Sequence, residues 1–455
     1  MLRNWFERMV SALCVALAVC CVAFSSQAHA AGFAILEQSA EGMGVAYAGS
    51  SAGYGDGSEV YFNPAAMSWI EGTQISHSSH LIIPSADFEN QGSSNSLIGG
   101  VPIGGGNGPD GGEVAYVPSV FLTHQVDDMF TTGFGIHAPF GLATKYDESW
   151  VGRYHAVESE LTTISLTPAV AIRPISDVDF SIGAAVNVIY ADATLSNSID
   201  FGTIALAQLG APTATALGLS PQANDGFGEV KGDDWGVGFT LGAAYRYDDR
   251  GSRVGVSWHS RVQVDLTGDA TFRVPTAALP LTGMGFFTDS SASAGVDLPE
   301  SIQFGGVHFL DDKWSLLAEM QWTRWDRFDE LRIKFGNGQP DSVQDESWEN
   351  VWRYSLGVNY QAMEDLKLAA GFTFDEEPIP DAAHRTPRIP GNNRRWLALG
   401  VDYQATDDLA IRASYAHLFV SDGAVIDSDA VGNTLIGTFD NAVDLVSIGF
   451  DYSLG

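Results

Sequence analysis

The chain has 455 residues, with 23 Lys and Arg against 56 Asp and Glu, so its formal net charge is −33. Phosphate binding needs clustered basic side chains, and this balance excludes nucleic acid as a partner. The 50 glycines and 11 tryptophans fit a large β-sheet better than a helical protein.

The N-terminus has the composition of a cleaved secretory signal. Arg3 and Arg8 precede an apolar run over residues 9–24, and Ala28-His29-Ala30 forms a small-x-small cleavage site. We therefore predict that residues 1–30 are removed on export. A lipoprotein signal ending at Cys20 or Cys21 is the alternative, but Val19 is bulky where that site needs a small residue.

All three cysteines lie within this predicted signal, so the exported chain has no disulfide framework. After the signal, no apolar run approaches the roughly 20 residues that a membrane helix requires. The chain is therefore either soluble and exported, or it crosses a membrane as a β-barrel.

Residues 31–72 are rich in small side chains and lack the alternation of a strand. They end in a corner at Asn63-Pro64-Ala65, where proline fixes φ and offers no N–H to a ladder. We predict that this segment is a plug inside a barrel formed by residues 73–455. A disordered periplasmic tail is the alternative.

From residue 73 onward, apolar and polar residues alternate with period 2, as in "KWSLLAEMQW" at residues 313–322. The number of such runs is even, and each is about ten residues or longer, which is typical of tilted membrane strands. The sequence therefore predicts an all-β, 14-stranded antiparallel transmembrane barrel. Its expected strands cover residues 73–83, 113–125, 129–140, 158–173, 178–194, 234–247, 252–267, 299–310, 313–334, 350–361, 365–375, 395–404, 408–420 and 443–453.

The connections between these runs differ in length according to parity. A tight acidic turn follows every even run, as in "VDD" at residues 126–128 and "LDD" at residues 310–312. A long loop rich in Gly, Pro and Ser follows every odd run. A soluble sandwich has no reason to sort its loops in this way, whereas outer-membrane barrels have short periplasmic turns and long outer loops.

Two of the long loops, at residues 201–220 and 274–287, are unexpectedly apolar for a surface facing water. They either pack on each other or line an entrance for an apolar substrate. The candidate substrate-binding residues in these loops are Leu206, Leu209, Leu281, Phe286 and Phe287.

Catalytic and metal motifs are weak. The glycine-rich stretch at residues 99–112 lacks the strand-to-helix context of a phosphate loop. His77 and His80 would point to opposite faces of one strand, and the acidic stretch "FDEEPIPD" at residues 374–381 is typical of a solvated loop. We expect neither an enzyme, nor a metal site, nor a cofactor.

Several ordered motifs resemble the FadL/OmpP1/TodX family of outer-membrane transporters for long-chain fatty acids and other hydrophobic compounds. They are "AGFAILEQSAEGMGVAYAG" at residues 31–49, the triplet Asn63-Pro64-Ala65, "PFGLATKYDESWVGRYH" at 139–155 and "FDEEPIPDAAHRTPRIPGNNRRW" at 374–396. Together with the strand rhythm, the resemblance covers nearly the whole exported chain.

The resemblance implies that residues 31–72 form a hatch whose NPA triplet lies against an inward kink of the third strand. That kink would fall at Phe140, Gly141 and Leu142, where glycine in a strand marks a bend or a close approach. Substrate would enter a pocket near Phe33, Ile35 and Leu36, and leave sideways through the kink into lipid. Arg332, Arg153 and Arg395 are the candidate cations for an acid headgroup.

The resemblance thus implies passive uptake of long-chain fatty acids in a bacterial outer membrane, with membrane lipid and the barrel-assembly machinery as partners. Three alternatives stay open: uptake of aromatic or aliphatic hydrocarbons, an adhesin or structural barrel, and a general porin, which the plug disfavours.

Overall fold

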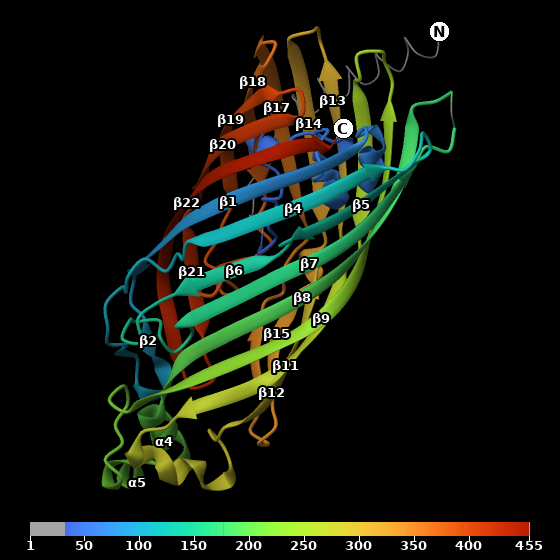
Figure 1. The fold of residues 1–455 in the computed structure, drawn as a ribbon. Helices are drawn as coiled ribbons and strands as arrows, with labels where there is room; N and C mark the ends of the chain where they lie inside the picture. Colours follow the sequence, from blue (N-terminus) through green and yellow to red (C-terminus); the bar gives the residue numbers. More distant parts are fainter. Residues whose placement is uncertain (1–31, 176, 455) are drawn as a thin grey trace.

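The computed structural model describes residues 32–454 except residue 176, so the predicted signal lies outside the described residues. The described chain forms a closed, antiparallel, 14-stranded barrel, as predicted (Figure 1). Each of the fourteen barrel strands pairs with the barrel strands before and after it in the sequence. The first, β1, closes the ring against the last, β22, from Thr73↔Leu454 to Asn90↔Gly437. No described helix is long and apolar enough to span a membrane.

Several barrel strands consist of two segments joined at a bend. In chain order the wall is made by β1 (Thr73–Asn90), β4 (Ala115–Gln125), β5 (Phe130–His137) with β6 (Gly141–Lys145), β7 (Glu158–Ile172), β8 (Phe180–Asp200), β9 (Asp225–Arg246), β10 (Arg253–His259) with β11 (Val262–Arg273), β12 (Ser290–Leu298) with β13 (Ser301–Phe309), β14 (Trp314–Thr323) with β15 (Glu330–Phe335), β16 (Ser342–Asp345) with β17 (Val351–Met363), β18 (Leu366–Asp375), β19 (Arg394–Thr406), β20 (Leu409–Val420) with β21 (Gly423–Ser428), and β22 (Asn433–Leu454). The short β2 (Ser94–Asn95), η3 (Ser96–Ile98) and β3 (Val101–Pro102) lie in the first long loop.

The predicted alternation sorts side chains between the two faces of the wall. On β9, Trp235, Val237, Phe239 and Leu241 are each more than half exposed, while Thr240 between the last two is buried. Aromatic pairs such as Trp314–Tyr360, with ring centroids 4.5 Å apart, lie on this outer face. A band of exposed apolar and aromatic side chains is the surface that a barrel presents to lipid.

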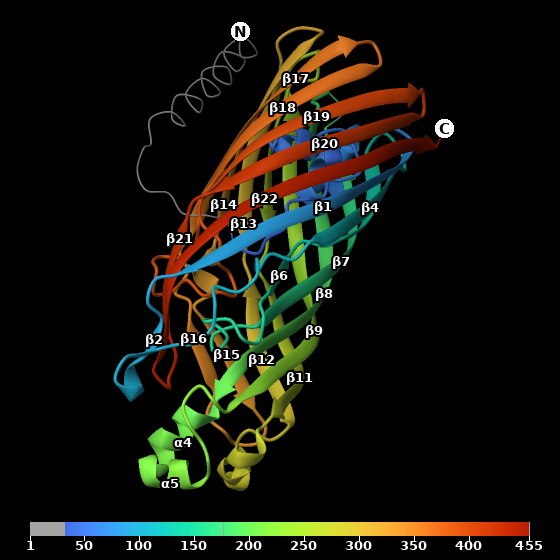
Figure 2. The ribbon, with the colours of Figure 1, turned by 90° about the vertical axis from the view of Figure 1, so that its left-hand side faces the viewer.

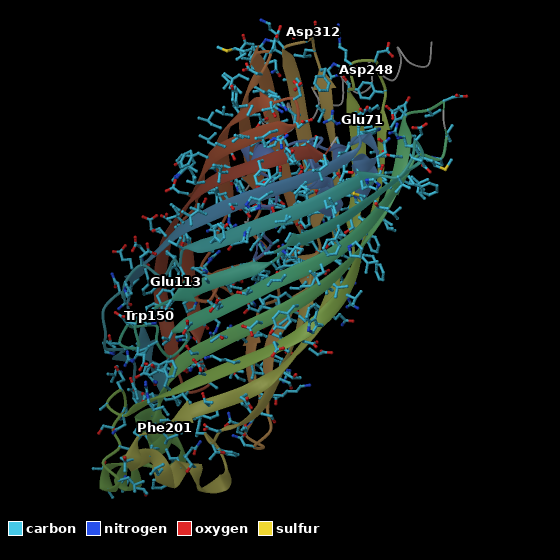
Figure 3. The ribbon with its side chains drawn as sticks, viewed as in Figure 1. Glu71, Glu113, Trp150, Phe201, Asp248 and Asp312 are labelled. Carbon is cyan, nitrogen blue, oxygen red and sulfur yellow. The ribbon has the colours of Figure 1, made fainter. Side chains whose placement is uncertain are left out.

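The tight turns lie at one end of the barrel and the long loops at the other, as predicted. Figure 3 shows Asp248 and Asp312 near the end with short turns, and Phe201 near the opposite end. The acid in a turn has a structural reason: Asp311 Oδ1 accepts hydrogen bonds from the backbone N–H groups of Lys313 and Trp314, both at 2.8 Å.

Strands β8 and β9 extend beyond their predicted ends, to Asp200 and from Asp225. Their register is unbroken over this extension, from Tyr190↔Trp235 to Asp200↔Asp225. Outward-facing residues here include Glu229, Lys231 and Asp233, so the apolar alternation used for the prediction weakens while the ladder continues.

The two apolar loops pack on each other. They fold into α4 (Phe201–Leu209), α5 (Ala211–Ala216) and η4 (Thr276–Met284), and Phe201 packs against Phe287 with ring centroids 5.0 Å apart. Leu281 is buried in the same cluster, whereas Leu209 on α4 is 38% exposed. Figure 1 shows these helices at the far tip of the barrel.

The N-terminal segment, residues 32–72, lies within the ring of strands, as Figures 1 and 2 show in blue. It contains α2 (Ala40–Gly44), η1 (Ser50–Ala52), α3 (Glu59–Phe62) and η2 (Pro64–Trp69). On one side, Glu41 forms ion pairs with Lys367 of β18 at 2.6 Å and with Arg412 of β20 at 2.9 Å.

On the other side, the triplet Asn63-Pro64-Ala65 contacts β8, β9 and β10. Asn63 Nδ2 donates to the carbonyl oxygens of Ala243 at 3.2 Å and Ser51 at 2.5 Å, and Ser181 donates to the Ala65 carbonyl at 2.8 Å. The expected contact between this triplet and Phe140–Leu142 is therefore wrong in location. Residues 33–35 make that contact instead, as described below.

Glycine is required where the wall receives the triplet. A Cβ at Gly242 would lie 1.9 Å from Asn63 Oδ1, and one at Gly183 would lie 2.3 Å from the Ala65 nitrogen. The strand glycines thus form a flat seat for the N-terminal segment.

We expect Gly242→Ala to unseat the segment at a cost of about 1–3 kcal/mol, because the added methyl overlaps Asn63. The measurement is small-ion conductance in planar bilayers, which should rise when the lumen is less well filled. Gly295→Ala on β12 is the matched control, since its Cβ would meet nothing nearer than 3.5 Å. Wild-type conductance in Gly242→Ala would contradict this account of the seat.

Candidate functional site: an apolar cavity behind the interrupted third strand

The third barrel strand is interrupted between β5 and β6. β5 pairs with β4 only over Thr131–Ile136, and β6 pairs with β7. On the other side of β6, the described residues contribute a single bridge, between Thr144 and Gly112. The wall therefore has a gap between β4 and β6.

The N-terminal segment supplies hydrogen bonds that the interrupted strand lacks. Ile35 N–H donates to the Pro139 carbonyl at 2.9 Å, and Gly141 N–H donates to the Phe33 carbonyl at 3.0 Å. Gln38 Nε2 donates to the Ala138 carbonyl at 2.7 Å. Buried backbone groups need such partners, so residues 33–38 hold the inward bend.

A cavity of about 460 Å³ lies beside this contact, within the size range of ligand pockets. Phe33 stands at its aromatic side, with ring centroids 4.8 Å from Trp325, 5.6 Å from Phe328 and 5.8 Å from Trp348. Ile35 and Leu36 also line the cavity. These three N-terminal residues therefore line one cavity, and their role in substrate binding stays a prediction.

The same cavity reaches both edges of the wall gap. Residues 114–117 on the β4 side and residues 140–144 on the β6 side line it. An apolar space inside the barrel is thereby continuous with the break in the third strand.

Two guanidinium groups and two buried carboxyl groups give the cavity a polar side, and the exposed Glu113 and Glu160 also line it. Arg353 of β17 donates to Gln321 Oε1 from Nη2 at 2.6 Å and from Nε at 3.1 Å, and its buried Nη1 has no hydrogen-bond partner among the described residues. Arg394, Asp375 and Glu37 line the same cavity. Asp375 is the cross-strand neighbour of both arginines.

Glu37 belongs to the N-terminal segment and is buried. Burial raises the pKa of Glu37 to about 7, against the opposing effects of backbone hydrogen bonds and of Arg394 and Arg353. This carboxyl group is therefore close to half-protonated at neutral pH. It is a titratable neighbour for any anion that the arginines bind.

The three arginines expected from the sequence lie away from this cavity. Arg332 is bound to Glu330 at 2.6 Å and to Asp341 at 3.2 Å near the outer end of β15. Arg153 is buried in a loop against Asp225 at 2.8 Å. Arg395 is exposed on β19, whereas the next residue, Trp396, is buried. Because side chains alternate along a strand, Arg394 faces inward with Trp396, and both line the cavity.

The candidate residues of the apolar loops are also distant from the cavity. Leu281 and Phe287 belong to the packed loop cluster, and Leu206, Leu209 and Phe286 lie in the same two loops. None of the five is among the residues that line the cavity.

Comparison with known proteins decides the family. A sequence profile described as "Outer membrane protein transport protein (OMPP1/FadL/TodX)" matches residues 21–454. The chain belongs to this family. Its members are outer-membrane β-barrel transporters of hydrophobic compounds rather than enzymes.

Relatives of this family are similar over most of their length. The chain is 29% identical to "Putative outer membrane protein NMB0088" of Neisseria meningitidis, over 94% of this chain and 96% of the relative. It is 28% identical to a "Long-chain fatty acid transport protein" of Escherichia coli, over 88% and 90%. It is also 28% identical to "Outer membrane protein P1" of Haemophilus influenzae, over 86% of each chain.

Two solved structures share the fold. A Pseudomonas aeruginosa FadL homologue superposes with a TM-score of 0.85 at 24% identity, covering 93% of this chain and all of that one. The Pseudomonas putida toluene transporter TodX superposes with a TM-score of 0.70 at 18% identity, covering 93% and 99%.

Proposed function

We propose that this chain is a bacterial outer-membrane channel for passive uptake of long-chain fatty acids, exported through a cleaved signal peptide. The observation that carries the proposal is the cavity that combines an aromatic, apolar side with the Arg353 and Arg394 guanidiniums. The alkyl chain of a fatty acid needs an apolar environment, and its carboxylate needs a cation. During export and insertion the chain depends on the barrel-assembly machinery, and lipid surrounds its outer face.

In this proposal the N-terminal segment is a hatch, and the gap between β4 and β6 is a lateral exit. The support is that residues 33–36 both line the cavity and contribute the hydrogen bonds that hold the bend at Ala138–Gly141. Phe140, Gly141 and Leu142 then form one edge of the gate. Asn63, Pro64 and Ala65 anchor the hatch on β8, β9 and β10.

Lateral exit has an energetic rationale. Moving an alkyl chain from an apolar cavity through water costs about 0.8 kcal/mol per CH₂. A route through the wall into lipid avoids that cost. No energy-coupling group is needed, because transfer into lipid is favourable by itself.

Hydrocarbon uptake is the second candidate, and the aromatic cluster around Phe33 favours it. Aromatic ligands pack well against edge-to-face ring clusters such as Phe33 with Trp325 and Phe328. The two candidates differ in their need for the arginines, since a hydrocarbon has no charge to offer them.

The deciding experiment measures uptake of radiolabelled oleate by a transport-null strain that carries this protein or a variant lacking residues 33–36. We expect uptake with the wild type and its loss with the deletion. A correctly assembled wild-type barrel that imports toluene but no oleate would favour the hydrocarbon route. Import of neither would favour an adhesin or structural role.

Oleate binding should also depend on pH through Glu37. Below its pKa of about 7 this group is neutral, and above it the ionised carboxylate competes with the substrate for Arg394 and Arg353. We expect binding to weaken about 3- to 10-fold as the pH rises from about 6 to about 8. Binding to the purified barrel, followed by tryptophan fluorescence, measures this change.

Glu37→Gln should remove the pH dependence and keep the affinity seen at low pH. Glu71→Gln is the control, because Glu71 is exposed and lies near the rim with short turns (Figure 3). Equal pH profiles for the wild type and Glu37→Gln would show that another group is responsible.

A further inference from the structure

A second, smaller cavity of about 50 Å³ adjoins the apolar one. The two share Ala34, Leu36, Phe140, Gln321 and Thr323 in their linings. The two cavities therefore adjoin at the N-terminal segment, the bend of the third strand and β14. By volume the small cavity holds a few water molecules or one small polar group.

The small cavity is uncharged, and polar residues line part of it. Besides the shared residues, its lining includes the polar residues His137, Ser165, Asn187, His259 and Ser301, together with apolar ones such as Ile189 and Val262. It contains no Asp, Glu, Lys or Arg, in contrast to the large cavity with its two arginines. Its chemistry suits a neutral hydrogen-bonding group and disfavours an isolated charge.

His137 of β5 supplies an unused hydrogen-bonding atom at this cavity. The residue is 2% exposed, and its Nε2 lies 3.0 Å from Thr167 Oγ1. Its Nδ1 has no hydrogen-bond partner among the described residues. Leaving such an atom unpaired is costly, and a ligand hydroxyl can act as either donor or acceptor for it.

The surroundings hold the imidazole in place. Its ring lies 4.9 Å from that of Tyr61 in the N-terminal segment and stacks on Phe121 at 5.7 Å. Thr167 keeps further hydrogen bonds to Ser165 at 2.9 Å and Asn187 at 3.1 Å. The polar network next to the cavity is thus fixed before any ligand arrives.

We propose that the small cavity is a subsite for a neutral hydroxyl or carbonyl group on a hydrophobic substrate. The inference rests on the proposed function, in which the apolar cavity holds the substrate. It deepens that function by naming oxygenated hydrophobic compounds, such as hydroxylated fatty acids and alkylphenols, as a preferred class. The hydroxyl contacts His137, while the rest of the molecule stays in the apolar cavity.

The test compares ligands that differ by one hydroxyl, using the purified full-length barrel in detergent and tryptophan fluorescence. One set is octadecanoate with a series of octadecanoates that carry a single hydroxyl at successive carbons. The other pair is toluene and p-cresol. We expect at least one hydroxyl position, and p-cresol, to bind about 3- to 10-fold more tightly than the parent compound.

His137→Phe should erase this preference and leave the affinity for the parent compound unchanged, since it keeps a ring of similar shape. Ser301→Ala should reduce the preference and provides a second, smaller change at the same cavity. His80→Phe is the matched control: His80 is fully buried and also has an unpartnered nitrogen, but lines neither cavity. For each variant, a barrel that stays folded in cold detergent shows that the protein has assembled.

The proposal is overturned if the wild type prefers no hydroxylated ligand, as for a cavity that holds only water. It is also overturned if folded His137→Phe and Ser301→Ala both keep the preference. Failure of octadecanoate to bind at all would count against fatty-acid uptake instead, and the p-cresol and toluene pair would then decide the subsite alone.

Discussion

Replacing Arg353 by methionine is expected to weaken oleate binding about 10- to 100-fold while leaving toluene binding unchanged. Arg353 is 5% exposed, and its Nη1 has no hydrogen-bond partner among the described residues, so this nitrogen can donate to a carboxylate in the cavity. Methionine keeps the length and the apolar contact of the side chain but loses the charge. Titration of the purified barrel with both ligands measures the effect.

Arg395→Met is the matched control, because Arg395 is exposed and lies next to Arg394 on the same strand. It should bind both ligands as the wild type does. Equal losses for oleate and toluene in Arg353→Met would indicate a damaged cavity, and unchanged oleate binding would refute a headgroup role for Arg353.

Filling the gap between β4 and β6 should separate binding from transport. Ala115 and Ala143 line the cavity at the two edges of the gap. We expect the double variant Ala115→Trp with Ala143→Trp to lower oleate uptake by cells at least about tenfold, because two indoles obstruct the opening. Oleate affinity of the purified barrel should change about threefold or less, since the residues around Phe33 and Arg353 are untouched.

Ala413→Trp on β20 controls for the added bulk, because Ala413 is exposed on another part of the wall. Cells with this variant should import oleate normally. Normal uptake by the double variant, with its barrel assembled in the membrane, would rule out exit through this gap.

The barrel could be predicted from sequence because its signals are repetitive and local. Alternation in β14 and β9 fixes which side chains face outward, and acidic turns such as the one at Asp311 mark the ends of hairpins. The plug assignment of residues 31–72 rests on a weaker signal, a segment of small residues without alternation that fits no strand, and it stays a prediction.

The polar side of the cavity could not be predicted, because it depends on which of two neighbouring residues faces inward. In "NNRRW", only the burial of Trp396 shows that Arg394 and Trp396 share the inner face. Arg353 had a weaker signal, a single cation at an inward position of β17. Nothing in the sequence shows that it meets Gln321 of β14 or that Arg332 is neutralised by Glu330.

The seat of the NPA triplet was equally hidden. A glycine in a strand, such as Gly183 or Gly242, can mark a bend, a weak strand or a docking point. Only the three-dimensional approach of Asn63 and Ala65 distinguishes these possibilities. The resemblance instead implied a contact between the triplet and a kink at Phe140, Gly141 and Leu142.

The closure of the ring has a consequence for how the protein folds. Every hairpin joins strands that are neighbours in the sequence and can form early. The pairing of β1 with β22, from Thr73↔Leu454 to Asn90↔Gly437, joins the two ends of the barrel sequence. This seam pairs strands from the two ends of the chain and needs the sheet between them, so closure should limit the folding rate. Until it happens, β1 and β22 expose unpaired edges that invite aggregation.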